Sequence, residues 1–140
     1  MSSRHAADER AFVNERRAME LIARGEGVAI EFKAASNGVH DDVFETVCSF
    51  ANGNGGDMFL GVNDHGQVVG LSREILDDIK REMLQVCSVT GLFTKPVPVS
   101  VQEMVLNRRH IVHVRIPCMR QDVAYKGCRY VRHGDADFRA

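Results

Sequence analysis

Three carboxylates, Glu26, Glu31 and Asp64, are candidates for metal-assisted chemistry. Glu26 and Glu31 are five positions apart, which places them on opposite faces of a regular strand. Gly25 and Gly27 flank Glu26 and allow the chain to turn it toward Glu31. If the strand before Asp64 pairs beside the strand of Glu31, the three carboxylates could bind Mg²⁺ or Mn²⁺ and activate water against a phosphodiester. The alternative is that Glu26 and Asp64 are solvated turn residues and that Glu31 pairs with a nearby base.

Cations gather toward the C-terminal end of the chain. Residues 107–140 hold eight Lys and Arg against three Asp and Glu, whereas the whole chain has a net charge of -1. This distribution predicts a basic edge that faces a polyanion. The candidate nucleic-acid ligands are Lys33, Arg108, Arg109, Lys126, Arg129 and Arg132.

Each of these cations also has a structural alternative. Lys33 shares a strand face with Glu31 and can contact a phosphate or pair with that carboxylate. Arg129 and Arg132 are three apart on a strand and point to opposite faces, so one of them should face the protein. Salt bridges that flank the core are the alternative to phosphate contacts for the whole set.

Four cysteines, Cys48, Cys87, Cys118 and Cys128, form no C-x-x-C pair. The first ten residues lack the apolar core of a secretory signal, so we expect reduced thiols in a cytoplasmic protein. His113, Cys118 and Cys128 could gather around zinc, but their spacing matches no standard zinc pattern.

The periodicity of apolar residues predicts a single compact α/β (α+β) domain, with a mixed, mostly antiparallel sheet and about three helices. We expect helices over 14–24, 41–52 and 72–87, and strands over 28–33, 58–62, 67–71, 99–106, 111–116, 123–125 and 129–131. The strands 58–62 and 67–71 should form a hairpin. We divide the chain into an N-terminal extension over 1–14 and a domain over 15–140. The 140 residues, 44% of them hydrophobic, exclude a disordered chain, and no apolar run is long enough for a membrane span.

The glycine-rich stretch 52–56 ends the second predicted helix. Its backbone N–H groups could cradle a phosphate, but it is no Walker motif, because it follows a helix and does not open one. The alternative is a helix stop followed by a close approach of strands.

Five motifs in order resemble the Schlafen AlbA_2 domain. They are Glu26-x4-Glu31-Phe-Lys33, Ser49-Phe-Ala-Asn-Gly-Asn-Gly-Gly56, Phe59-Leu-Gly-Val-Asn-Asp64-His-Gly66, Val69-Gly70 and Tyr130-Val-Arg-His-Gly134. The resemblance covers about residues 15–140. It implies a compact domain that binds nucleic acid, described in prokaryotic members as DNA-binding or regulatory.

In the Schlafen branch, related domains cut tRNA and rRNA with a three-carboxylate site, which corresponds here to Glu26, Glu31 and Asp64. The chain departs from the family pattern after Tyr-x-Arg-x-Gly, where Asp135 and Asp137 would repel phosphate. It also has Gly53 where the family often has Thr.

We therefore predict a nucleic-acid-binding domain, in the first place for DNA, of a transcriptional regulator. The alternative is a metal-dependent endoribonuclease that acts on structured RNA, with Mg²⁺ or Mn²⁺ as its only cofactor. A third reading is a scaffold domain whose basic face meets another protein. The expected partner is DNA or RNA, with no membrane, and the chain could form a homodimer or belong to a longer protein.

Overall fold

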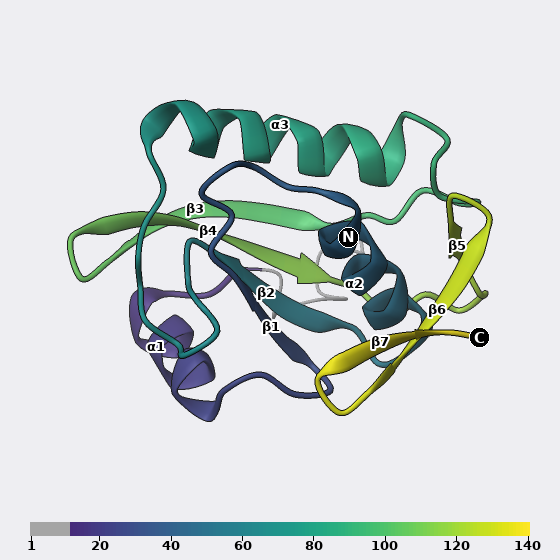
Figure 1. The fold of residues 1–140 in the computed structure, drawn as a ribbon, viewed down its shortest axis with the longest axis horizontal. Helices are drawn as coiled ribbons and strands as arrows, with labels where there is room; N and C mark the ends of the chain where they lie inside the picture. The colour runs from purple at the N-terminus through teal and green to yellow at the C-terminus, as the bar shows by residue number, and fades with distance from the viewer. Residues whose placement is uncertain (1–11) are drawn as a thin grey trace, which may run out of the picture.

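The computed structural model describes residues 12–140, and its centre is a four-stranded sheet in the order β1–β2–β4–β3 (Figure 1). The strands are β1 (Ile30–Lys33), β2 (Gly56–Leu60), β3 (Ser100–Leu106) and β4 (Arg109–Ile116). β1 runs parallel to β2, whereas β2 pairs with β4, and β4 with β3, in antiparallel fashion. The sheet is therefore mixed and mostly antiparallel, and β2 lies beside β1 as the carboxylate hypothesis required.

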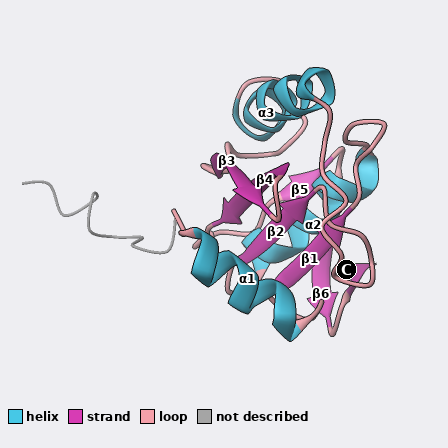
Figure 2. Cartoon of the chain, turned by 90° about the vertical axis from the view of Figure 1, so that its left-hand side faces the viewer, coloured by secondary structure: helices cyan, strands magenta, loops and turns pink. Residues whose placement is uncertain are grey.

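Three helices cover the two faces of this sheet (Figure 2). They are α1 (Glu15–Arg24), α2 (Asp41–Asn52) and α3 (Arg73–Ser88). α1 lies on one face, and α2 and α3 lie on the other. The side chain of Asn14 accepts a hydrogen bond from the backbone N–H of Arg17 and caps the N-terminus of α1. The hydroxyl of Ser72 accepts one from the backbone N–H of Ile75 and caps α3. All three predicted helices are thus confirmed. None of the helices within residues 12–140 is long and apolar enough to cross a membrane.

A second, three-stranded sheet packs against α2. Its strands are β5 (Ala124–Tyr125), β6 (Cys128–His133) and β7 (Ala136–Arg139), with β6 in the centre. Tyr125 and Tyr130 bury their rings in the core that α2 and α3 share with the main sheet. α2 therefore lies between the two sheets, and Figure 1 shows β6 and β7 beside the start of β1.

Alternation along the strands separates two hydrophobic cores. Phe32 and Phe59 point toward α1, whereas Met58 points toward α2 and α3. Because neighbouring residues of a strand face opposite sides, Glu31 points toward α2. Val13 exchanges two hydrogen bonds with the side chain of Gln102, at 3.1 and 2.9 Å, but residues 1–11 of the predicted extension lie outside the described residues.

Two predicted features of the strands were wrong. Residues 67–71 form no strand: a single bridge joins Val62 to Val68, and Gly66 and Gly70 adopt positive φ angles that a regular strand does not contain. β7 was not predicted, because the alternating run of its residues, Ala136–Arg139, is four residues long, the shortest run that indicates a strand. The single expected sheet is in fact two sheets.

The glycines after α2 permit the chain to pass close to its neighbours. A Cβ atom on Gly56 would lie 2.5 Å from the ring of Phe50, and one on Gly55 would lie 2.6 Å from the carbonyl oxygen of Ile116. Both approaches are shorter than a van der Waals contact, so the structure supports the interpretation as a helix stop and close approach.

Replacement of Gly56 by alanine should therefore destabilise the domain by about 1–3 kcal/mol, because the methyl group must displace the Phe50 ring. Urea unfolding would measure the change. Gly27→Ala is the matched control, since a Cβ there meets nothing within 4 Å, and it should alter stability by less than about 0.5 kcal/mol. Equal stability of the two variants would contradict the packing argument.

Candidate nucleic-acid interface

Two of the three predicted carboxylates meet at the free edge of β1. Glu26 precedes the strand and folds back along it, so that its Oε2 accepts a hydrogen bond from the N–H of Phe32 at 2.9 Å. Glu31 leaves the strand on the side of α2 and is 5% exposed. The turn that the flanking glycines allow thus places Glu26 beside Glu31.

Arg132 of β6 is the base that pairs with Glu31. Its Nη2 lies 2.8 Å from Oε1 of Glu31, and its side chain is 3% exposed. The same guanidinium donates to the carbonyl oxygens of Gly27, at 3.0 and 3.1 Å, and of Ile30, at 3.3 Å. Of the two arginines on this strand, Arg132 is therefore the one that faces the protein, and its burial leaves it little surface for a phosphate.

α2 and β7 supply the remaining contacts of the Arg132 guanidinium, and we refer to all of its contacts as the Arg132 network. Nη1 of Arg132 lies 2.9 Å from Oδ1 of Asp137, and the guanidinium stacks on Phe50 at 4.8 Å from the ring centroid. Thr46 donates to Asp137 at 2.6 Å, and Ser49 donates to the same carboxylate. Asp137 is thus turned inward and neutralised, so it does not present the repulsion to phosphate that its position in the sequence predicted.

Burial raises the pKa of Glu31 to about 7, and the hydrogen bond with Glu26 acts in the same direction. The hydrogen bond with Arg132 and the charge of Lys33, whose Nζ lies 3.6 Å from Glu31, oppose this rise. Glu31 therefore takes up a proton at a higher pH than an ordinary glutamate does.

Asp64 does not form a three-carboxylate cluster with this pair in the described part of the chain. It is exposed in the turn after β2, and it lines a surface hollow with Phe32 and residues of α1. Phe32 and Glu31 face opposite sides of β1, so this hollow lies on the side of α1, whereas Glu31 points toward α2. Within residues 12–140, no group of three His, Cys, Asp or Glu side chains is arranged to hold a metal ion. The set implied for Mg²⁺ or Mn²⁺ therefore does not fit, and neither does a zinc site.

The three zinc candidates, His113, Cys118 and Cys128, lie on separate elements. His113 is buried in β4, where its Nε2 lies 2.8 Å from Oδ1 of Asp57. Arg115 donates to the other oxygen of Asp57 at 3.0 Å. Cys118 is exposed in the loop after β4, and Cys128 begins β6.

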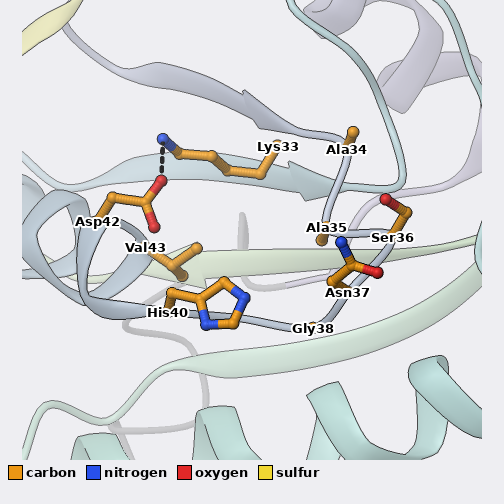
Figure 3. A pocket seen from close by; sticks show the side chains of 9 residues that line it. All are labelled: Lys33, Ala34, Ala35, Ser36, Asn37, Gly38, His40, Asp42 and Val43. Atoms are coloured by element: carbon orange, nitrogen blue, oxygen red, sulfur yellow. Dashed lines mark hydrogen bonds and ion pairs between the residues drawn. The ribbon is translucent and has the colours of Figure 1, made fainter.

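Lys33 lines a small surface pocket of about 200 Å³ with the loop 34–38 and the start of α2 (Figure 3). Its Nζ lies 2.9 Å from Oδ2 of Asp42, as the dashed line in Figure 3 shows. Burial opposes the charge on Lys33, but the hydrogen bond with Asp42 and the charge of Glu31 raise the pKa of this lysine. Its charge is therefore neutralised from two sides.

Lys126 and Arg129 are also matched by acids. Lys126 lies in the turn between β5 and β6, with its Nζ 2.8 Å from Asp41, and it lowers the pKa of that carboxyl. Nε of Arg129 lies 3.0 Å from Asp122. Both cations are partly exposed, and such surface pairs are weak enough to exchange for a phosphate.

Arg108 and Arg109 differ from the other four cations. They lie at the turn between β3 and β4, and both are exposed. Arg109 donates to the carbonyl oxygen of Val69 at 3.2 Å, but neither arginine pairs with an acid within the described part of the chain. Arg108 and Arg109 are therefore the two predicted ligands whose charge is uncompensated.

The basic C-terminal third does not form one edge, contrary to prediction. Figure 1 shows the β3–β4 turn, with Arg108 and Arg109, at one end of the main sheet and the β5–β6 turn, with Lys126, at the other. Arg132 is buried between them. The sequence places these cations close together, but β4 carries the chain from one end of the domain to the other.

A comparison with family models matches residues 26–140 to the model described as Schlafen, AlbA_2. The chain belongs to the Schlafen AlbA_2 family. Its matched region begins at Glu26, the first residue of the motifs named above. Two helices, two sheets and the Arg132 network all lie within it, whereas α1 precedes it.

Two solved structures resemble this AlbA_2 domain. One is the N-terminal domain of an ATP-dependent DNA helicase RecG-related protein from Nitrosomonas europaea, with 27% identity and a TM-score of 0.57, covering 72% of each chain. The other is the DIP2311 protein from Corynebacterium diphtheriae, with 15% identity and a TM-score of 0.58, covering 81% of this chain and 22% of that one. The second shows the likeness of fold alone. No curated protein matches the chain.

The geometry explains why three AlbA_2 motifs occur together. Glu31 comes from the first motif, Ser49 and Phe50 from the second, and Arg132 from the last, and all of them meet in one network. Asp137 completes it and was not predicted as a site residue. Its signal in the sequence was an acid three positions after Gly134 of the last motif, where phosphate binding would disfavour one.

The stability of the domain should depend on the protonation of Glu31. Its native pKa of about 7 lies above the ordinary value of 4.5, so the native state binds the proton more tightly than the unfolded chain. This tighter proton binding adds on the order of 2–3 kcal/mol to the free energy of unfolding. The added stability is fully present below pH 4.5 and is lost as the pH rises through 7. Denaturant unfolding from pH 5 to 8 would show a smaller loss in Glu31→Gln. Glu20→Gln, on the exposed surface of α1, is the control and should keep the parent profile. A Glu31→Gln profile parallel to that of the parent would refute the assignment.

Loss of Arg132 should be far more costly than loss of Arg129 on the same strand. Arg132→Ala leaves Glu31 and Asp137 without their cation, which costs about 3–5 kcal/mol for a buried pair. Arg129→Ala removes a partly exposed pair and should cost less than about 1 kcal/mol. Unfolding in urea compares the two variants, and similar losses would show that Arg132 is not the structural arginine.

Proposed function

We propose that this chain is a DNA-binding module of a transcriptional regulator, which holds the phosphate backbone through the turn between β3 and β4. The observation that carries the proposal is the uncompensated charge of Arg108 and Arg109. Paired cations must give up an acidic partner before they bind a phosphate, whereas these two need not. Phosphate contacts of this kind supply most of the affinity for DNA and set the orientation of the protein.

The backbone of the turn supports a functional role for Arg108. Asn107 and Arg108 form a two-residue loop with φ angles of 51° and 64°. Hairpin loops of this kind favour glycine at the second position, because a side chain is strained at positive φ. An arginine there is less stable than a glycine, and strained residues of this sort cluster at functional sites.

The surroundings of the turn also favour an anion. Arg108, Arg109 and His110 line an open hollow of about 330 Å³ together with Gly70 and Ser72. Ser72 begins α3, whose N-terminal end carries a partial positive charge that attracts phosphate oxygens. The hollow thus combines side-chain cations with a helix terminus.

DNA is preferred to RNA as the ligand because the similar protein from Nitrosomonas europaea is named for a DNA helicase. The proposed regulator acts in the cytoplasm. The ribonuclease alternative lacks its third carboxylate, since Asp64 lines a hollow beside α1 and Glu31 points toward α2.

The double variant Arg108→Glu/Arg109→Glu should weaken binding to a labelled 20-base-pair duplex by roughly 10- to 100-fold, across unrelated sequences alike. It should also reduce the dependence of log Kd on log salt concentration by about 2, since two phosphate contacts are lost. Fluorescence anisotropy between 50 and 200 mM salt would measure both effects.

The control is Arg16→Glu/Arg17→Glu, which makes the same change of charge on the exposed surface of α1. Equal weakening by both double variants, or no binding by the parent, would overturn the proposal. The variant Arg108→Gly distinguishes a loss of DNA binding from a loss of folding, because it should change the two in opposite directions. It should weaken binding while raising the stability of the turn by about 0.5–1 kcal/mol.

A further inference from the structure

The outer face of the β5–β6–β7 sheet exposes aromatic and cationic groups that the proposed phosphate contacts do not use. Tyr130 and Arg132 point inward from β6, so Arg129, Val131 and His133 point to the opposite side of the strand. On β7, Asp137 points inward, and Phe138 therefore points outward. We refer to Arg129, Val131, His133 and Phe138 as the β6–β7 platform.

Two rings form the centre of this platform. The ring of Phe138 is 50% exposed and meets the exposed imidazole of His133 edge-on, with centroids 5.6 Å apart and an interplanar angle of 63°. Val131 is the cross-strand partner of Phe138 and extends the apolar surface. Antiparallel sheets with exposed aromatic side chains stack unpaired bases, because each base has an apolar face and a polar edge.

The charges around the platform suit the phosphates of a single strand. The side chain of Arg129 is 38% exposed and forms an ion pair with Asp122. Arg139 is the cross-strand partner of Tyr130, so it points away from the platform, as Asp137 does. Arg132, Thr46 and Ser49 satisfy Asp137 on that opposite side. One cation, Arg129, therefore lies beside the rings, and the inward acid is hidden from a ligand.

A hollow continues the platform on the side of β1. It has a volume of about 380 Å³ and is lined by Val28 and Val131, and on its inner side by Phe50 and Arg132. Val28 is 65% exposed and offers a second apolar contact. The hollow meets the platform at Val131 alone.

We propose that the β6–β7 platform binds single-stranded nucleic acid, with bases stacked on Phe138 and His133 and a phosphate beside Arg129. The inference rests on the proposed function, since it assumes that the domain binds nucleic acid. It adds a second surface, remote from Arg108 and Arg109, that selects unpaired bases. A duplex keeps its bases stacked inside and cannot use the rings.

The test compares a labelled 20-nucleotide oligo-dT with the 20-base-pair duplex by fluorescence anisotropy. Phe138→Ala should weaken binding to oligo-dT by roughly 10- to 100-fold and leave binding to the duplex unchanged. Phe138→Tyr should restore binding to oligo-dT, because the ring remains. Val105→Ala, another exposed apolar side chain on β3, is the matched control and should bind both probes as the parent does.

The outcomes separate this inference from the proposed function. A parent that binds the duplex but not oligo-dT, or a Phe138→Ala variant that binds oligo-dT like the parent, overturns the platform alone. A parent that binds neither probe overturns the proposed function and the platform with it. Analytical ultracentrifugation tests whether a second copy of this chain covers the platform instead. If the parent is a dimer and Phe138→Ala is a monomer, this face is a dimer interface and the inference is overturned.

Discussion

The guanidinium of Arg132 must find acceptors away from water, and much of the domain is arranged to supply them. A buried cation is tolerated only when its hydrogen-bond donors and its charge are satisfied. Glu31 and Asp137 provide the charge, and the carbonyl oxygens of Gly27 and Ile30 provide further acceptors. The planar fork of arginine suits this fixed arrangement, which a lysine could not reproduce. The two sheets are therefore joined by one side chain whose position admits little change.

The same requirement explains how the domain divides its cations between structure and surface. Acids satisfy Arg132 and Lys33 near β1, and acids pair with Lys126 and Arg129 on the second sheet. Among the predicted nucleic-acid ligands, only the arginines of the β3–β4 turn extend into solvent without such a partner within the described residues. The net charge of the chain is near zero, but the β3–β4 turn carries a local excess of positive charge. The position of this excess on an exposed turn supports an interaction with DNA more than its size does.

The sequence predicted the helices well because each has a local signal. Asn14 and Ser72 are caps, and Gly53 follows the last turn of α2. It predicted the burial of one arginine on β6 from alternation, but not that Asp137 would turn inward to meet it, because that contact joins strands through tertiary packing. Asp64 was misplaced for a related reason. Its position depends on the side of the sheet to which the turn after β2 folds, and no local pattern encodes that choice.

The groups along the outer edge of β1 have a consequence for self-association. A strand at the edge of a sheet normally offers its backbone to any extended peptide, which is a route to aggregation. Here the N–H of Phe32 is bonded to Glu26, and the carbonyl oxygen of Ile30 is bonded to Arg132 and to the N–H of Gly27. An incoming strand would find these groups engaged by the chain itself. The guanidinium that holds the two sheets together, with the carboxylate of Glu26, therefore also protects this edge against the addition of another β-strand.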